Sequence, residues 1–270
     1  MPELPEVENA RSVIARGALG RRVVDVDDHD TWVCRPHPPG QIRTALVDRE
    51  LTVAHRRGKS MWCETSDGGP MLGIHLGMSG KIVIADPDGT EVDGGDYWER
   101  GRAPGDYRFA RFTLTFADGG RLMLVDPRRL GRIRLDPPIE VLGPDATEIT
   151  PAEFRAALAR GTAPVKARLL DQHAIAGIGN LLADDILWRA KVHPGRPVDE
   201  LTPDMVDALL RATRYAIRTT VRDGGVHTLA SLGLRGPDAR CPRDGTPTVH
   251  GTYGGRSTWW CPLDQKEGPP

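Results

Sequence analysis

Cysteine is scarce in this chain of 270 residues, which has four, and two of them lie far from the other two. Such a set does not build the dense disulfide framework of a small secreted domain. No apolar run approaches the ~20 residues that a helix needs to span a bilayer, and the acidic N-terminus lacks the pattern of a signal peptide. These absences predict a soluble, cytoplasmic protein without a membrane partner.

An excess of positive charge is also lacking, because 36 Lys and Arg face 37 Asp and Glu, for a net charge of −1. This balance argues mildly against nucleic acid, although binding requires only a local basic stripe. Two clusters of cations could supply one: Arg56, Arg57 and Lys59, then Arg128, Arg129, Arg132 and Arg134. The chain has no glycine-rich phosphate-binding loop and no internal repeat. Nothing in the sequence therefore indicates a nucleotide cofactor.

The most informative residue that is present is Pro2, directly behind Met1. Methionine is readily removed before a small residue, which would leave a secondary amine at the N-terminus. Such an amine titrates near ~7.7–8, well below the ~10.4 of lysine, so an appreciable unprotonated fraction can form a Schiff base. Glu3 is adjacent and Glu6 lies one helical turn on, where a carboxylic acid can transfer protons. The same residues are also typical of a helix N-terminus.

The N-terminal stretch Met1-Pro2-Glu3-Leu4-Pro5-Glu6-Val7-Glu8 resembles the start of the formamidopyrimidine-DNA glycosylase and endonuclease VIII family. Five further motifs, in the family's order, extend this resemblance over nearly the whole chain: 56–60, 75–80, 126–131, 165–172 with 176–184, and 256–262. Five collinear motifs are hard to obtain by chance. The sequence is therefore identified as a member of this family.

The resemblance implies a base-excision-repair DNA glycosylase with abasic-site lyase activity. Pro2 would attack C1′ of the damaged nucleoside, Glu3 would protonate the sugar ring oxygen and shuttle protons, and Lys59 would stabilise the phosphate or the developing charge. Successive β and δ eliminations would then cut the strand. The expected partner is double-stranded DNA that contains damaged bases or abasic sites, bound by a monomer, with no redox cofactor.

The family motifs also indicate residues that would contact DNA. Met78, Arg128 and Leu130 would fill the space of an everted nucleotide, whose extrusion costs a few kcal/mol. Lys166 and Asn180 would clamp the phosphates that flank the lesion. Arg256 would contact DNA from a hairpin tip. Each of three of these assignments has an alternative: Met78 and Leu130 could be core residues, and Asn180 could be an ordinary N-cap.

The C-terminal motif departs from the family. Its two Cys-x2-Cys pairs are replaced by two Cys-x2-Asp pairs, with sixteen residues between them. Carboxylates are uncommon ligands of structural zinc, which overwhelmingly uses Cys and His. The sequence leaves two alternatives open: a zinc site of Cys241, Asp244, Cys261 and Asp264, or a metal-free hairpin held by Trp259, Trp260 and Tyr253.

The predicted fold is α+β and multi-domain. Residues 1–135 are expected to form an N-terminal helix and an antiparallel β-sandwich that carries the catalytic residues. A linker follows over 136–150, then a helix-two-turn-helix domain over 151–235 and a zinc-finger-like β-hairpin with a tail over 236–270. Alternating runs at 111–116 and 121–125 predict two strands of a hairpin, whereas residues 86–108 are rich in Gly, Asp and Pro and suggest a long surface loop.

The sequence leaves alternatives open for both the substrate and the activity. The region 222–233 is shorter than in the branch that excises 8-oxoguanine, and Leu130 stands where that branch usually has phenylalanine, so the lesion and the opposite base stay open. A catalytically inactive protein that binds damaged DNA is the main rival function. A sequence-specific regulator is less favoured, because the segment from Asn180 to Asp184 is too apolar and acidic for a major groove.

Overall fold

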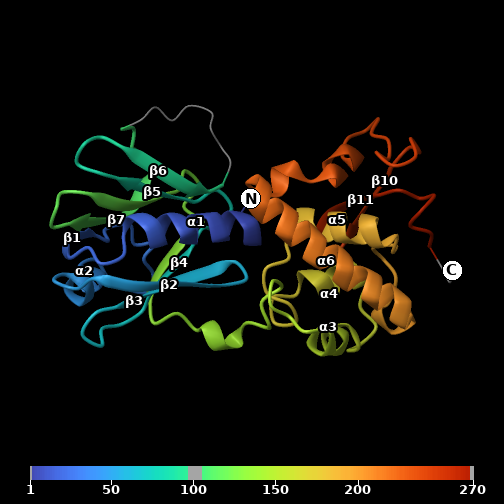
Figure 1. Ribbon diagram of the computed structural model, residues 1–270, viewed down its shortest axis with the longest axis horizontal. Coiled ribbons are helices and arrows are strands. Elements are labelled where there is room, and N and C mark those ends of the chain that lie inside the picture. The colour runs from blue at the N-terminus through green and yellow to red at the C-terminus, as the bar shows by residue number, and fades with distance from the viewer. Residues whose placement is uncertain (1, 97–104, 268–270) are drawn as a thin grey trace. The chain divides into compact units, whose positions relative to one another are not determined.

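The computed structural model describes residues 2–96 and 105–267, and all that follows concerns these residues (Figure 1). The chain divides into two compact units, one of residues 1–2 with 6–139 and one of residues 3–5 with 140–270. The short segment Glu3–Pro5 thus belongs with the second half of the chain, which the sequence did not predict. The predicted four-part boundaries at 135, 150 and 235 stay predictions.

The first unit contains helix α1 (Leu4–Gly17, with its first two residues counted in the second unit), the short helix α2 (Gln41–Leu46) and two antiparallel sheets. One sheet has five strands in the order β1 (Val23–Asp27), β7 (Ala110–Phe116), β8 (Arg121–Val125), β5 (Lys81–Ala85) and β6 (Glu91–Gly95). The other has four, in the order β2 (Leu51–Arg57), β3 (Ser60–Thr65), β4 (Leu72–His75) and β9 (Arg132–Leu135). Apolar residues of both sheets and of α1 share one buried core, so the predicted β-sandwich is confirmed.

The alternating runs at 111–116 and 121–125 form β7 and β8, which pair as the predicted hairpin. The predicted loop over 86–108 is wrong in part, because β6 forms within it and pairs with β5, while residues 97–104 lie outside the described chain. This strand lies at the sheet edge and has only two buried residues, so it lacks the apolar alternation of a typical strand. A Cβ on Gly94 would lie 3.0 Å from the backbone of Ala10 in α1. Glycine, which suggests a loop, here permits close packing of the helix.

The second unit is built from helices α3 (Pro151–Leu158), α4 (Val165–Leu170), α5 (Asn180–Ala190) and α6 (Pro203–Asp223), with short 3-10 turns η1 (Ile139–Val141, at the boundary), η2 (Val198–Glu200), η3 (Val226–Thr228) and η4 (Ala230–Leu234). Thr150 begins α3 with a capping box, in which its hydroxyl accepts from the backbone N–H of Glu153 at 3.2 Å. Pro151 occupies the first helical position, where its missing N–H costs nothing. Leu4 is fully buried in the core of this unit.

Strands β10 (Val249–Tyr253) and β11 (Arg256–Trp260) form the C-terminal hairpin, which follows the helices in the same unit. A small cluster of Trp188, Leu234, Cys241 and Cys261, with Trp259 against it, joins this region to α5. The predicted order of β-sandwich, helical domain and hairpin is therefore confirmed. Among the described helices, none has both the length and the apolar character needed to cross a membrane.

Candidate active site

Glu3 is anchored at the N-terminus of α5. Its two carboxylate oxygens accept hydrogen bonds from the backbone N–H groups of Leu181 at 2.8 Å and Leu182 at 3.0 Å, and its side chain is fully buried. The unpaired N–H groups and the dipole of a helix N-terminus stabilise negative charge at this position. A Cβ on Gly179 would lie 2.2 Å from the Glu3 Cδ atom. Only glycine at 179 therefore leaves room for this carboxylate.

A second hydrogen bond near α5 also holds the start of the chain. The backbone N–H of Leu4 donates to the Gly177 carbonyl at 3.3 Å, one residue beyond Glu3. Pro2, which is buried, is thus directly followed by two residues that are held in place: Glu3 by the first turn of α5, and Leu4 by the Gly177 carbonyl before that helix. That Gly179 makes space for Glu3 is a role that the sequence did not predict.

Lys59 lies in the turn between β2 and β3, after Gly58, whose φ of +59° is a left-handed conformation that favours glycine. Its neighbour Ser60 pairs with His75 at the end of β4. Burial, and after it the positive charge of Lys59, lowers the pKa of His75. The ring Nδ1 of His75 accepts from the backbone N–H of Gly77 at 3.0 Å, which leaves the proton of the neutral ring on Nε2. His75 thus lies close enough to Lys59 to respond to its charge, and the sequence analysis predicted no separate role for it.

One buried carboxylate organises the two loops that carry the predicted void-filling residues. Asp126 Oδ1 accepts from the Ser79 hydroxyl at 2.6 Å and from the Arg128 backbone N–H at 3.1 Å. Its Oδ2 accepts from the backbone N–H groups of Leu130 and Gly131, both at 2.7 Å. With no exposed surface, Asp126 ties the loop after β8 to the loop after β4.

The two loops also touch directly, since a Cβ on Gly77 (φ +62°) would lie 2.4 Å from the carbonyl group of Leu130. Met78 is half-buried, whereas Arg128 and Leu130 are exposed. The structure therefore brings the three together on one surface of the first unit. Because Leu130 is exposed, the alternative that it is a core residue is wrong.

Lys166 lies elsewhere than the sequence suggested. Its side chain is fully buried, and its Nζ donates to Asp184 at 2.6 Å, to the Thr258 hydroxyl at 2.7 Å and to the Ser257 carbonyl at 3.2 Å. Asp184 is also paired with Arg235 at 2.6 Å. A lysine without exposed atoms does not contact a phosphate in this conformation. Its bonds instead join α4 and α5 to strand β11 of the hairpin. We refer to Lys166, Asp184 and Arg235 as the hairpin anchor.

Asn180 and Arg256 flank this anchor. The Asn180 side-chain amide donates to the Ser257 carbonyl at 3.1 Å, while its Oδ1 is buried and has no hydrogen-bond partner in the described chain. Arg256 precedes Ser257 in β11 and is exposed beside the Gly254–Gly255 turn. The structure therefore brings the predicted residues Asn180, Lys166 and Arg256 to one place through Ser257, but only Arg256 offers an exposed charge.

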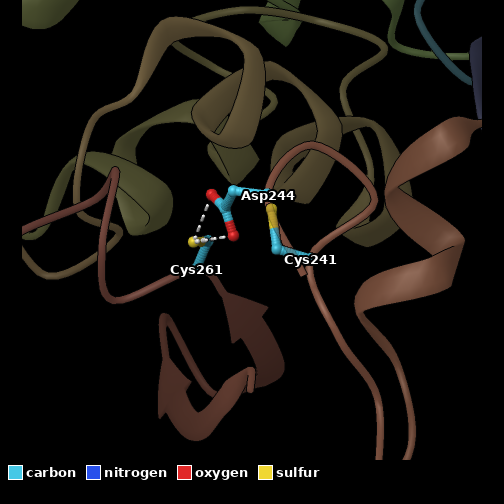
Figure 2. Close-up of side chains that lie close together, drawn as sticks. All are labelled: Cys241, Asp244 and Cys261. Atoms are coloured by element: carbon cyan, nitrogen blue, oxygen red, sulfur yellow. Dashed lines mark hydrogen bonds between the residues drawn. The ribbon is translucent and has the colours of Figure 1, made fainter. Parts of the chain in front are cut away.

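Three of the four predicted metal ligands gather at the base of the hairpin (Figure 2). Ligand atoms of Cys241, Asp244 and Cys261 lie within 4.8 Å of one another, and the Cys261 sulfur is 3.4 Å from Asp244 Oδ2. Hydrogen bonding, chiefly from the Thr246 side chain, lowers the pKa of Asp244 to about 2. Asp264 does not join them, because its carboxylate pairs with Lys191 at 3.0 Å and with Arg243.

These residues fit a structural zinc ion only in part. A closed structural site has four protein ligands in tetrahedral geometry. Here the fourth candidate, Asp264, forms ion pairs with Lys191 and Arg243 instead. Other bonds hold the same region: the Trp188 indole donates to the Cys241 sulfur at 3.4 Å, and Gln265 accepts from the Cys261 N–H at 3.0 Å and donates to the Val192 carbonyl at 2.9 Å. The group can hold a metal, but the hairpin has support that does not depend on one.

Comparison with known proteins agrees with this geometry. The family model for the formamidopyrimidine-DNA glycosylase N-terminal domain matches residues 1–133, and that for the H2TH domain matches residues 142–231. A formamidopyrimidine-DNA glycosylase of Nocardioides sp. is 33% identical over 98% of this chain and 94% of its own length, and one of Salinispora arenicola is 34% identical over 98% and 96%. The Lactococcus lactis Fpg in complex with abasic-site DNA superposes with a TM-score of 0.81 at 25% identity, over 98% of this chain and 100% of that one.

Proposed function

The chain belongs to the formamidopyrimidine-DNA glycosylase family, and from this premise we propose that it is a base-excision-repair DNA glycosylase with abasic-site lyase activity. The anchoring of Glu3 at the N-terminus of α5 carries this proposal, because it fixes an acid beside the residue that would become the N-terminus. The substrate is double-stranded DNA with damaged bases or abasic sites. Related structures bound to abasic-site DNA and to DNA that contains carbocyclic 8-oxo-G support this class of ligand.

The first step requires that Met1 has been removed. The Pro2 nitrogen then attacks C1′, and the bond from C1′ to the damaged base breaks, with the bonding electrons and the amine proton going to the base. The nitrogen lone pair next expels the ring oxygen, which takes its proton from Glu3, and an iminium forms. The two backbone N–H donors on Glu3 stabilise the carboxylate that this transfer leaves behind.

The iminium makes the neighbouring sugar position acidic, and two eliminations follow. Loss of the C2′ proton breaks the C3′–O bond, and loss of the C4′ proton breaks the C5′–O bond, so that phosphate leaves on both sides. Water then hydrolyses the iminium and frees Pro2. Lys59 stabilises the phosphate charge, with the neutral His75 beside it as a hydrogen-bond donor through Nε2.

The two loops tied by Asp126 would hold the duplex open. Leu130 and Met78 replace part of the stacking that is lost when the damaged nucleotide leaves the helix, and Arg128 donates to the base left unpaired. Exposed Arg256 and the amide of Asn180 would contact the phosphates of the lesion strand. Lys166 supports them from within.

Borohydride trapping tests the proposal, with duplexes carrying an abasic site, 8-oxoguanine, a hydantoin or an oxidised pyrimidine. Reduction of the iminium is expected to leave a covalent adduct whose yield ranks the lesions, and the intact mass of the same sample shows whether Met1 is absent. Pro2→Gly is expected to lose trapping while it keeps lesion binding. No adduct at an abasic site, with Met1 absent, would contradict the lyase step and favour a protein that binds damage without chemistry.

A further inference from the structure

Trp32 is the largest side chain of an exposed segment between β1 and α2, with half of its surface (50%) open to solvent. The segment is fastened to strand β9, since the Ile133 N–H donates to the Val33 carbonyl at 3.0 Å and the Leu135 N–H donates to His37 Nε2 at 3.1 Å. The exposed indole presents an aromatic face to solvent, and aromatic faces of this kind can stack with nucleic-acid bases.

Two guanidinium groups accompany this ring. Arg35 Cζ lies 3.7 Å from the centroid of Trp32 and Arg132 Cζ lies 5.6 Å from it. Neither arginine is paired with a carboxylate in residues 2–96 and 105–267. Stacking on the indole restricts the guanidinium of Arg35 while leaving its N–H donors available for an anion.

Asp30, two residues before Trp32, is already paired with another arginine. Asp30 accepts a bidentate pair of hydrogen bonds from Arg129, at 2.9 and 2.8 Å. This pair also joins the Trp32 segment to the loop that carries Arg128 and Leu130. Trp32 and its two arginines therefore adjoin the loop that carries the proposed wedge.

We propose that Trp32, Arg35 and Arg132 form a binding site for the DNA strand opposite the lesion. The two guanidinium groups bind its phosphates, and the indole contacts a sugar or base. This inference rests on the proposed function, and it assigns the site to the opposite strand because the segment is bonded to the loop whose Arg128 meets the unpaired base. Combined aromatic and cationic surfaces are the usual means of holding a nucleic-acid strand without reading its sequence.

The test compares two ligands that carry the same tetrahydrofuran abasic analogue, a duplex and the single lesion strand. Trp32→Ala is expected to weaken duplex binding about tenfold, as loss of a stacked contact does, and to leave binding to the single strand unchanged. Arg35→Gln and Arg132→Gln are each expected to reduce the salt slope of duplex binding by about 0.9, the value for one phosphate contact.

Arg121→Gln is the matched control, because the Arg121 Cζ atom also lies over an aromatic ring, 4.8 Å from the centroid of Tyr107, but Arg121 belongs to β8 of the five-stranded sheet. It is expected to bind as wild type. Unchanged duplex affinity and salt slope in all three site variants would overturn the proposal, and an equal loss on both ligands would assign the site to the lesion strand instead. Thermal unfolding of each variant separates loss of the site from loss of the fold.

Borohydride trapping on a single-stranded abasic oligonucleotide keeps this inference distinct from the proposed chemistry. That trapping is expected in wild type and in Trp32→Ala alike. If wild type traps no abasic strand, the lyase proposal fails while the duplex measurement still decides the role of Trp32. If wild type traps and Trp32→Ala discriminates duplex from single strand, both proposals stand.

Discussion

Two buried carboxylates organise the surfaces proposed to meet DNA, and they do so by different means. Asp126, in the first unit, is surrounded by neutral donors: one hydroxyl and three backbone N–H groups. Asp184, in the second, is held by the two cations of the hairpin anchor, Lys166 and Arg235, each at 2.6 Å. Burial opposes charge on both partners of the Lys166–Asp184 pair, so it raises the pKa of Asp184 and lowers that of Lys166.

The difference lies in where the partners come from. Three of the four donors to Asp126 are within five residues of it. A local turn is enough to bring them to the carboxylate, so the loss of chain entropy is small. The partners of Asp184 come from α4 and from the segment after η4, and they meet only when the second unit is complete. A neutral cage fixes a loop, whereas an ion-pair anchor fixes one element against another at a larger cost in desolvation.

The largest effect is expected from removing the anchoring carboxylate. Asp184→Ala leaves the buried Lys166 ammonium without its ion-pair partner, which destabilises a protein by about 3–5 kcal/mol. Urea unfolding measures this loss in the free energy of unfolding. Lys166→Met with Asp184→Leu is expected to recover part of that loss, because an apolar pair can replace a buried ion pair. A double variant no more stable than Asp184→Ala would show that the charges are not the source of the effect.

The neutral cage is expected to be less sensitive. Asp126→Asn keeps the shape of the side chain but replaces one acceptor oxygen with an amide that donates, so it loses bonds on one side of the cage. We expect a loss of about 2–3 kcal/mol in unfolding free energy and weaker binding of lesion duplex. A variant that keeps full stability but loses lesion binding would instead assign Asp126 to DNA contact.

A smaller effect separates support from contact at Lys166. Lys166→Met is expected to weaken lesion-duplex binding about tenfold and to add little in an Arg256→Ala background, because it acts through the position of Arg256. The double variant should have the same salt slope of duplex binding as Arg256→Ala alone. If Lys166 contacts a phosphate, the salt slope of duplex binding will instead fall by a further value of about 0.9.

The smallest effect is expected from chelation. A closed structural zinc site supplies about 10–16 kcal/mol to folding, and its loss would unfold the hairpin. Because only three donors gather while Asp264 pairs with Lys191 and Arg243, we expect EDTA to lower the melting temperature by less than about 4 °C, or roughly 1 kcal/mol. One tightly held zinc per chain and collapse of DNA binding on chelation would contradict this.

The same contrast explains what the sequence could predict. The fold and the loops of Met78, Arg128 and Leu130 depend on local turns and alternating strands, which leave signals in the residues themselves. Lys166 was predicted to clamp a phosphate because it lies in a segment that resembles the family's helix-two-turn-helix motif. Its burial depends on Asp184 and Thr258, which are distant in sequence and carry no signal that they face it.

The metal site was predicted only in part, for a related reason: Cys241, Asp244 and Cys261 come together, whereas Asp264 does not join them. Spacing placed four donors correctly along the chain, but the sequence could not say that Arg243 and Lys191 would compete for Asp264. The anchoring of Glu3 was equally hidden, since a glycine such as Gly179 gives no hint of which side chain occupies the space it leaves. Long-range partners decide each of these cases.

The place of Glu3–Pro5 in the second unit has a consequence for how the protein is made. These residues leave the ribosome first, yet the N–H groups that hold Glu3 belong to α5 and the core that buries Leu4 is assembled from later residues. Domains fold as units during synthesis, so the N-terminal segment must wait for its own binding site to be translated. A growing chain therefore exposes its first residues until α5 has been made, and the proposed removal of Met1 would take place in that interval.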